Sequence, residues 1–276
     1  MEIIQTKGLK RNTIDKYYTK DEIVNQCLQF VKDNIQINKN HLIVEPSAGN
    51  GSFIKGIKTL SNEFRFYDLE PEHEEIMKQD YLDYHYKEEN NRYKSIHVVG
   101  NPPFGRQSSL AIKFIKKSCE FCNSFSFILP KSFKKESLKN KVPLNFHLIF
   151  EYDLPKNSFL VDNNEHDVPC VFQIWEKKEI ERTKVEKLIP NKFTFVGKPD
   201  NPDISFRRVG VNAGTIDKNV IDKSEQSHYF IKFDTPPSNE LIENIKNIQY
   251  PGKEYTVGPK SISKQELIQQ FTHLSI

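Results

Sequence analysis

From residue 20 to residue 130, short apolar runs typical of strands alternate with segments of helical periodicity. Crossovers of this length join parallel strands, so the alternation predicts an α/β fold on a mostly parallel sheet. Thr19 and Glu22 have the spacing of a capping box before the first helix. We expect strands at residues 41–45, 64–68, 96–99 and 125–130, and helices at residues 20–33, 52–60, 72–77 and 109–122.

The pattern changes after residue 130. Residues 146–152 and 170–175 read as strands with only a loop between them, so we expect an antiparallel pair at the sheet edge. We therefore expect a first domain of residues 1–178 and a small α+β appendage of residues 179–276. In the appendage we expect strands at residues 192–196, 204–209 and 228–233, and helices at residues 239–248 and 263–271.

Composition is that of a soluble globular protein, with 37% hydrophobic and 28% charged residues and a mean hydropathy of −0.63. No apolar run approaches the ~18–20 residues of a membrane-spanning helix, and the N-terminus lacks the apolar region of a secretory signal. The four cysteines, too few and too scattered for a disulfide scaffold, favour a reducing compartment. We expect an intracellular protein, cytoplasmic or nuclear, with no membrane partner.

The net charge of +3 conceals two opposed blocks. Residues 63–91 contain ten acidic and three basic residues, whereas residues 101–145 contain nine basic and two acidic ones. A basic block can steer a polyanion toward a site. Lysine is so abundant in this chain, however, that an ordinary solvated surface is the alternative interpretation.

A glycine turn joins the strand at residues 41–45 to the next helix. Its sequence, Glu-Pro-Ser-Ala-Gly-Asn-Gly at residues 45–51, is typical of a nucleotide-cofactor loop, because glycine lets the backbone approach a ligand closely. The dinucleotide fingerprint fails, since its third glycine would fall at Ile54, and no P-loop lysine follows. Glu45 and Asp68 end neighbouring strands, which favours a cofactor that bears a ribose and a free amine.

The tetrapeptide Asn101-Pro102-Pro103-Phe104 follows the strand at residues 96–99. The two prolines fix the backbone, so the Asn101 side chain and the Pro102 carbonyl can form a rigid pair of acceptors for an NH2 group. Phe104 offers a flat apolar face for a planar base. A stiff turn capped by asparagine is the structural alternative.

Five segments in this order and spacing resemble the S-adenosylmethionine-dependent N6-adenine methyltransferases, across about residues 14–178. Lysine stands at position 20, where that family usually has proline, and the appendage has no recognisable target-recognition motif. The segments are Lys16-Tyr17-Tyr18-Thr19, residues 45–53, Asp68-Leu69-Glu70-Pro71, Asp80-Tyr81 and Asn101-Pro102-Pro103-Phe104.

The resemblance implies a Rossmann-like methyltransferase sheet, mostly parallel with an antiparallel last strand, and it implies roles for individual residues. Asn101, Pro102, Pro103 and Phe104 would form the catalytic grip on the target adenine. The cofactor, S-adenosyl-L-methionine, would leave as S-adenosyl-L-homocysteine. Residues implied to contact it are Tyr17, Tyr18, Thr19, Glu45, Pro46, Ala48, Gly49, Gly51, Phe53, Asp68, Leu69, Asp80, Tyr81 and Asn101.

With that resemblance, the basic residues near the grip become candidates for nucleic-acid contact. They are Arg106, Lys131, Lys134 and Lys135. In the appendage, Arg207 and Arg208 precede a glycine turn, and nucleic-acid contact there competes with an ordinary hairpin bearing exposed charges. We predict no metal ion: Cys119 and Cys122 have ligand spacing but no second pair, which favours core cysteines. His166 and Asp167 fall in a loop near the carboxyl edge of the sheet; a solvated loop is the favoured interpretation, and contact with substrate is the alternative.

Three functions remain open on the sequence. The first is transfer of a methyl group to adenine N6 in DNA or RNA, with DNA slightly favoured. The second is methylation of a protein glutamine amide, an activity that shares the tetrapeptide but usually has tyrosine in place of Phe104. The third is a catalytically inert nucleic-acid-binding partner of an active subunit; otherwise we expect a monomer.

Overall fold

The structure, a computed structural model, describes residues 17–274, so Lys16 and the N-terminal segment examined for a signal lie outside the described residues. Its largest sheet has seven strands in the order β4-β3-β2-β5-β6-β10-β7. Their bounds are β2 (Leu42–Glu45), β3 (Glu63–Asp68), β4 (Met77–Lys78), β5 (Ile96–Gly100), β6 (Ser124–Pro130), β7 (Phe146–Asp153) and β10 (Cys170–Lys177).

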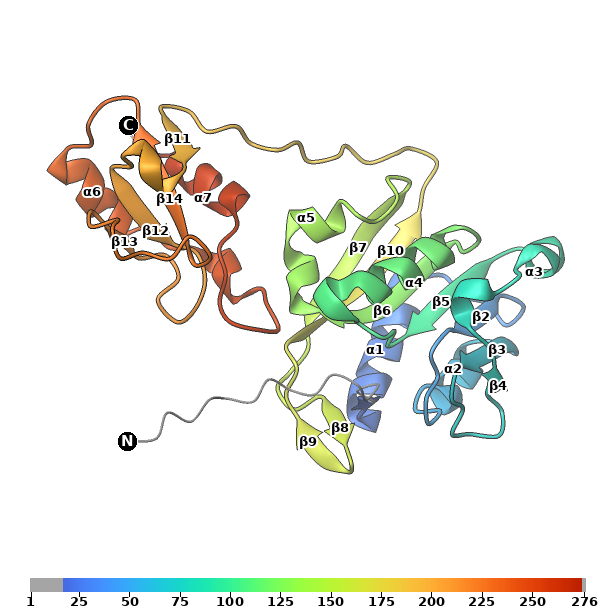
Figure 1. Cartoon of the computed structure of the whole chain (residues 1–276). Coiled ribbons are helices and arrows are strands. Elements are labelled where there is room, and N and C mark those ends of the chain that lie inside the picture. The colour runs from blue at the N-terminus through green and yellow to red at the C-terminus, as the bar shows by residue number, and fades with distance from the viewer. Residues whose placement is uncertain (1–16, 275–276) are drawn as a thin grey trace.

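Strands β4, β3, β2, β5 and β6 are mutually parallel, and β10 runs antiparallel to both β6 and β7. The last strand of this sheet along the chain, β10, is thus inserted between β6 and the edge strand β7 (Figure 1). The α/β fold class, the mostly parallel sheet and the antiparallel final pair are confirmed. The expected strands are present, within two residues at each end.

Helices cover both faces of this sheet. Helices α1 (Asp21–Asn34) and α2 (Ile54–Leu60) pack their apolar side chains against one face. Helix α4 (Ser109–Cys119) covers the other face, where Cys119 and Cys122 pack with the core. Shorter helical segments α3 (Lys87–Arg92), α5 (Glu136–Lys139), η1 (Tyr81–Asp83), η2 (Arg106–Ser108) and η3 (Lys131–Lys134) join the strands.

Two local predictions are wrong. Residues 72–77 form no helix, because the segment is fastened to the glycine turn: the Glu72 amide donates to the Gly49 carbonyl over 3.1 Å. The capping box is also absent. Lys20 is the N-cap of α1 and makes no side-chain cap, since Thr19 belongs to a strand, where its hydroxyl accepts from Asn101 Nδ2.

A second sheet was not anticipated from the sequence. Strands β8 (Phe159–Val161) and β9 (Asn164–His166) form a hairpin in the segment expected to be a solvated loop. The N-terminal strand β1 (Tyr18–Thr19) pairs antiparallel with β8. This order, β1-β8-β9, fixes the segment before α1 against the segment before β10.

The appendage contains a four-stranded antiparallel sheet in the order β11-β14-β12-β13, with a core of its own. The apolar faces of α6 and α7 pack into that core. Strand β13 is short and was not predicted. The elements are β11 (Phe193–Val196), β12 (Ile204–Arg207), β13 (Ile216–Asp217), β14 (His228–Phe233), α6 (Asn239–Lys246), α7 (Lys264–Phe271), η4 (Lys198–Asp200) and η5 (Pro251–Glu254).

An extended linker after β10 leads to the appendage (Figure 1). Its first part is held to the large sheet by Arg182, whose guanidinium lies over the Trp175 ring at 5.5 Å and donates to the main-chain oxygens of Lys139 and Val142. Its end is held to the appendage, because the amide group of Gln265 both accepts from and donates to the Leu188 main chain.

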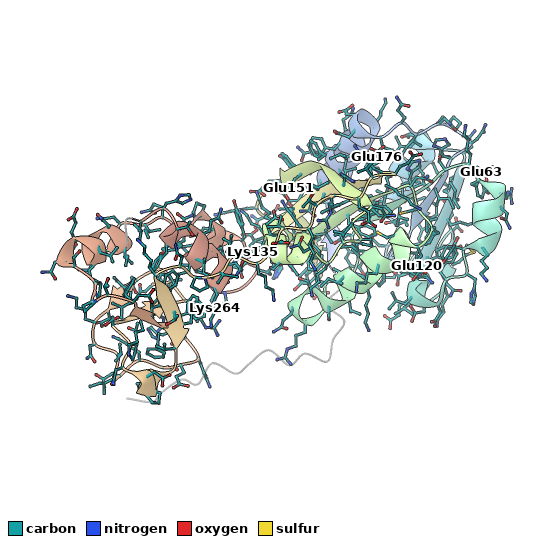
Figure 2. The ribbon with its side chains drawn as sticks, turned by 90° about the horizontal axis from the view of Figure 1, so that it is seen from above. Glu63, Glu120, Lys135, Glu151, Glu176 and Lys264 are labelled. Carbon is teal, nitrogen blue, oxygen red and sulfur yellow. The ribbon has the colours of Figure 1, made fainter. Side chains whose placement is uncertain are left out.

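The appendage also contacts the domain of the large sheet directly. Lys135, after β6, lies between these two parts of the molecule in Figure 2 and forms an ion pair with Glu266 of α7 at 3.2 Å. Glu266 at the same time completes the capping box of that helix with Ser263. In the described part of the chain, residues 17–274, no helix is both long and apolar enough to cross a membrane.

Candidate functional site

The motif residues gather at the carboxyl edge of the large sheet. Because β2, β3 and β5 are parallel neighbours, their last residues Glu45, Asp68 and Gly100 end at the same edge. Asn101 follows directly on β5. Asp80 reaches this edge as well, two residues after the end of β4. The fold therefore brings together motifs that lie up to eighty residues apart in the chain.

The glycine turn has the conformation that its glycines permit. Gly49 and Gly51 have φ angles of +53° and +87°, in the left-handed region. A Cβ on Gly51 would lie 2.8 Å from the Ile54 side chain, so a larger residue cannot replace it without displacement. The Gly49 amide donates to Asp68 Oδ2 over 2.8 Å, which ties the turn to the end of β3.

Glu45 is buried at the base of this turn, with only 1% of its surface exposed. Its Oε2 atom has no hydrogen-bond partner among residues 17–274. Burial raises the pKa of this carboxyl well above its ordinary value, and the nearby charge of Asp68 raises it further. A Cβ on Gly100 would lie 3.2 Å from Glu45 Cγ, so glycine at the end of β5 makes room for the carboxyl.

Asn101 contributes another buried acceptor without a partner, beside that of Glu45. Its Nδ2 donates to Thr19 Oγ1 over 3.3 Å, whereas its Oδ1 is buried and meets no donor within the described chain. The main chain is held as well, since Ser47 Oγ donates to the Asn101 carbonyl over 3.0 Å. The side chain is thus fixed with one acceptor left over. Buried acceptors are rarely left unpaired in a folded protein unless a ligand or water completes them.

Phe104 and the prolines continue from Asn101. Pro102 is buried and Pro103 is exposed, while Phe104 is half-buried against the α1 face of the core. The Phe104 carbonyl accepts from the first amides of α4. Beyond it, Gly105, Gln107 and Ser108 all have positive φ angles, a cluster of strained backbone typical of functional loops.

Residues in and beside strand β1 also line the candidate site. Tyr18 lies beside the glycine turn, where a Cβ on Gly49 would be 3.6 Å from its ring, and its hydroxyl donates to Glu72. Tyr17 packs against the exposed His166 of the β8–β9 hairpin, with ring centroids 5.3 Å apart. The hairpin therefore belongs to the wall of the site, which the sequence did not reveal.

The remaining cofactor candidates divide into two groups. Leu69 is 54% exposed directly after Asp68, and Asp80 Oδ1 accepts from the Leu82 amide. In contrast, the Tyr81 side chain is buried under α4 with its hydroxyl bonded to Ser118, so a ligand could meet only its main chain. The buried side chains of Pro46, Ala48 and Phe53 shape the turn from below.

The predicted phosphate-binding lysines are paired within the chain. Lys131 and Lys134 form ion pairs with Asp153 of β7, at 3.4 Å and 2.7 Å, and Lys135 pairs with Glu266. These pairs neutralise much of the basic block where it leaves the sheet. Arg106, in contrast, is exposed and forms no ion pair with any residue that the structure describes.

The two appendage arginines hold main-chain oxygens. Arg207 Nε donates to the Val209 carbonyl over 2.8 Å, and Arg208 donates to the Gln226 carbonyl while lying over the Tyr229 ring. Both side chains are half-buried. These hydrogen bonds stabilise the loops around the two arginines.

The opposite, amino edge of the large sheet holds a polar cavity of about 420 Å³. His41 Nδ1 lies 3.1 Å from His97 Nε2, and His97 Nδ1 lies 2.7 Å from Ser124 Oγ. Burial, with His41 beside it, lowers the pKa of His97 to about 3. His41, His97 and Ser124 are thus neutral and hydrogen-bonded to one another. The only signal for this group in the sequence was the position of its two histidines at the starts of strands.

The carboxyl edge is equipped to bind donors. It offers a buried carboxyl oxygen at Glu45 and a buried amide oxygen at Asn101, beside the glycine turn and the exposed Leu69 side chain. Such a set fits a cationic amine and an NH2 group. In the described chain no group of three or more His, Cys, Asp or Glu side chains could hold a metal ion.

No protein-family model and no curated protein matches the chain. Solved structures with a similar fold include a protein assigned as an RNA methyltransferase from Pyrococcus horikoshii, at 15% identity over 62% of this chain and 92% of the other, with a TM-score of 0.47. The 23S rRNA methyltransferase ErmE is 11% identical over 59% and 71%, with a TM-score of 0.43. A modification subunit assigned to a type I restriction enzyme of Vibrio vulnificus YJ016 is 11% identical over 86% and 63%, with a TM-score of 0.46.

Proposed function

We propose that the protein transfers a methyl group from S-adenosyl-L-methionine to the N6 amine of an adenine in nucleic acid, with DNA slightly favoured over RNA. The observation that carries the proposal is the pair of buried, unpaired acceptors at one sheet edge, Glu45 Oε2 and Asn101 Oδ1. Gly100, which ends β5 just before Asn101, has no side chain and so leaves room for Glu45.

The cofactor half of the site fits S-adenosyl-L-methionine. Glu45 and the glycine turn would hold its amino-acid end, Asp68 its ribose hydroxyls and Asp80 its adenine amine, with Leu69 covering the ring. Bound there, the cofactor supplies an electrophilic methyl group on a sulfonium. The acidic residues of this half suit a cation.

The target half of the site fits an exocyclic amine. Asn101 Oδ1 and the Pro102 carbonyl would accept the two amine hydrogens, which draws the nitrogen lone pair out of conjugation with the ring. Phe104 would stack on the base, a contact worth ~1–3 kcal/mol. Catalysis would then depend on positioning and on acceptors already in place before charge develops.

The test is a transfer assay with tritiated S-adenosyl-L-methionine and four acceptors: duplex DNA, single-stranded DNA, RNA and a glutamine-containing protein extract. We expect label in N6-methyladenine of nucleic acid. Label on glutamine would contradict the proposal and favour the amide methyltransferase. Cofactor that binds without transfer to any acceptor, or no cofactor binding at all, would instead favour the inert partner.

A further inference from the structure

Two loops of the appendage lie side by side. Residues 208–214 join β12 to β13, and residues 255–263 connect η5 to α7. The Gly210 amide donates to the Lys260 carbonyl over 2.9 Å, and an isolated antiparallel bridge joins the two loops next to this bond. They therefore form one continuous surface, which we call the paired loops.

The paired loops reach the carboxyl edge of the large sheet. Lys135 Nζ donates to the Ser261 carbonyl over 3.0 Å, and Lys134 Nζ lies 5.1 Å from the centre of the Tyr255 ring. Both lysines follow β6, which is parallel to β5, so they leave the sheet at the same edge as Asn101. The paired loops are thus next to the edge that would receive the target base.

Val211 is at the tip of the first loop, with 89% of its surface exposed. Gly210 and Gly214 flank it at φ angles of +101° and +104°. Two hydrogen bonds at its base fix the conformation of this loop. The Gly214 amide donates to the Arg207 carbonyl over 2.8 Å, and Arg207 Nε donates to the Val209 carbonyl. An apolar side chain is therefore presented to solvent on a braced turn.

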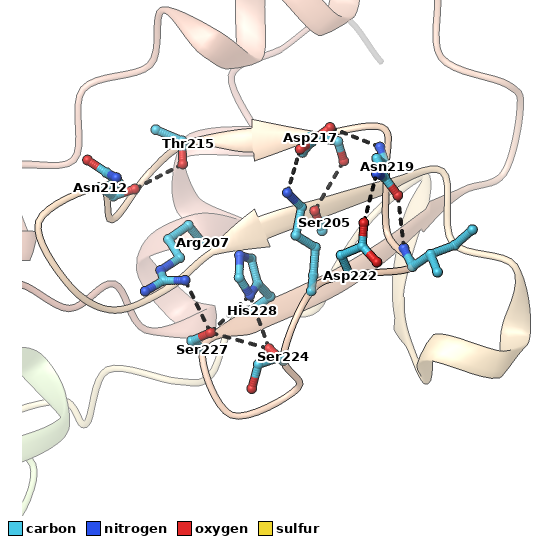
Figure 3. Close-up of polar contacts among 12 residues, drawn as sticks. Ser205, Arg207, Asn212, Thr215, Asp217, Asn219, Asp222, Ser224, Ser227 and His228 are labelled. Carbon is cyan, nitrogen blue, oxygen red and sulfur yellow. Dashed lines mark hydrogen bonds and ion pairs between the residues drawn. The ribbon is translucent and has the colours of Figure 1, made fainter. Parts of the chain in front are cut away.

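Hydrogen bonds within the hairpin add to this bracing. Figure 3 shows Thr215 bonded to the Asn212 carbonyl at the turn and Arg207 bonded to Ser227 beneath it. The neighbourhood has more basic than acidic groups. Arg207, Arg208, Lys253 and Lys260 are in or beside the paired loops, against Glu254, which forms an ion pair with Lys260 at 2.7 Å, and Glu266, which accepts from the Ser263 amide. A braced apolar tip among cations suits a partner that has both phosphates and stacked bases.

We propose that Val211 is a wedge that enters the base stack of the nucleic acid and occupies the space left when the target adenine turns outward. This inference rests on the proposed function and names the form of its substrate, a paired strand that must be opened. Opening costs a few kcal/mol for a paired base, and an inserted apolar side chain offsets part of that cost.

The experiment uses the full chain and an adenine-containing strand that it methylates, offered single-stranded and annealed to its complement. Val211→Ser should lower kcat/KM roughly tenfold on the annealed strand and less than twofold on the single strand. Val211→Leu should restore the rate. Ile221→Ser is the matched control, because Ile221 is 76% exposed on a different loop of the appendage.

Three outcomes would overturn the wedge alone: equal losses on both forms of the strand, a loss matched by Ile221→Ser, or transfer only to the single strand by the unmodified protein. Unchanged kinetics with weaker self-association in sedimentation would assign Val211 to a protein contact instead. If the unmodified protein transfers no methyl group to any nucleic acid, the proposed function fails first, and the wedge fails with it.

Discussion

The two edges of the large sheet contain polar residues in opposite states. At the amino edge, His41, His97 and Ser124 are hydrogen-bonded to one another around a cavity of about 420 Å³. At the carboxyl edge, Glu45 and Asn101 each keep a buried acceptor without a partner among the described residues. Under the proposed function, the cofactor and the target base would complete the two unpaired acceptors of the carboxyl edge, whereas the polar groups of the amino edge already have partners.

The largest expected effect would come from Asn101→Ala. Removing a positioned group that stabilises developing charge costs roughly a thousandfold in rate, so methyl transfer should fall by about that factor. Cofactor affinity should fall much less, since the proposed role of Asn101 Oδ1 is to accept from the target amine. The measurements are the initial rate with labelled cofactor and a cofactor titration by calorimetry. An Asn101→Ala variant that methylates at the unmodified rate would show that the carboxyl edge is not the site of methyl transfer.

Glu45→Gln should weaken cofactor binding by roughly a hundredfold, because a charge-assisted hydrogen bond to the cofactor's ammonium group is lost. The pKa of Glu45 is raised in the structure, mainly by burial, and a bound cation would lower it. Binding should therefore release a proton, and affinity should rise with pH while the free carboxyl remains protonated. Titrations at several pH values check this. An equally steep pH profile in Glu45→Gln would contradict it.

The amino edge should instead make the fold sensitive to acid. The pKa of His97 is about 3 in the fold, against 6.5 as its ordinary value. The unfolded chain therefore binds a proton that the folded chain excludes, and stability should fall as the pH drops from 6.5 toward 3. The loss from this residue should be about 2 kcal/mol at pH 5.

Urea unfolding at pH 7 and pH 5 measures that loss. His97→Gln, which has no titratable group at this position, should lose about 2 kcal/mol less than the unmodified protein between the two pH values. The same loss in both proteins would show that other groups govern acid stability.

The smallest effect is expected from Ser124→Ala. It leaves the buried Nδ1 of His97 without its partner, which should lower the free energy of unfolding by about 1–2 kcal/mol. Methyl transfer should remain unchanged, since the change lies at the edge opposite Asn101. Thermal unfolding and the transfer assay on the same sample separate the two quantities. A loss of activity with stability intact would show that the amino edge influences methyl transfer at the carboxyl edge.

Periodicity predicted the large sheet well, because its strands are continuous apolar runs bounded by glycine, proline and charged turns. It failed where long-range pairing overrides local preference. Thr19 has the spacing of a cap, but pairing of β1 with β8 places it in a strand. Residues 72–77 have helical composition, yet a bond from Glu72 to the glycine turn fixes them as a connection.

The candidate site was predictable in part because the parallel sheet was predictable. Parallel strands bring their ends together, so the positions of Glu45, Asp68 and Asn101 could be anticipated from strand order. The unpaired acceptors of Glu45 and Asn101 could not, since these depend on side-chain contacts between residues far apart in sequence. The ion pairs of Lys131, Lys134 and Lys135 likewise require β7 and α7 to be in place.

The linker fastened by Arg182 and Gln265 has an evolutionary consequence. Within the described chain, Arg182 and Val185 are hydrogen-bonded to the domain of the large sheet and Leu188 to the appendage, so the residues between Val185 and Leu188 set how far apart the two can stand. At no more than ~3.6 Å per residue, that tether extends to roughly 11 Å. An appendage exchanged for another by recombination would keep its reach to the same edge, provided that this short segment was inherited with it.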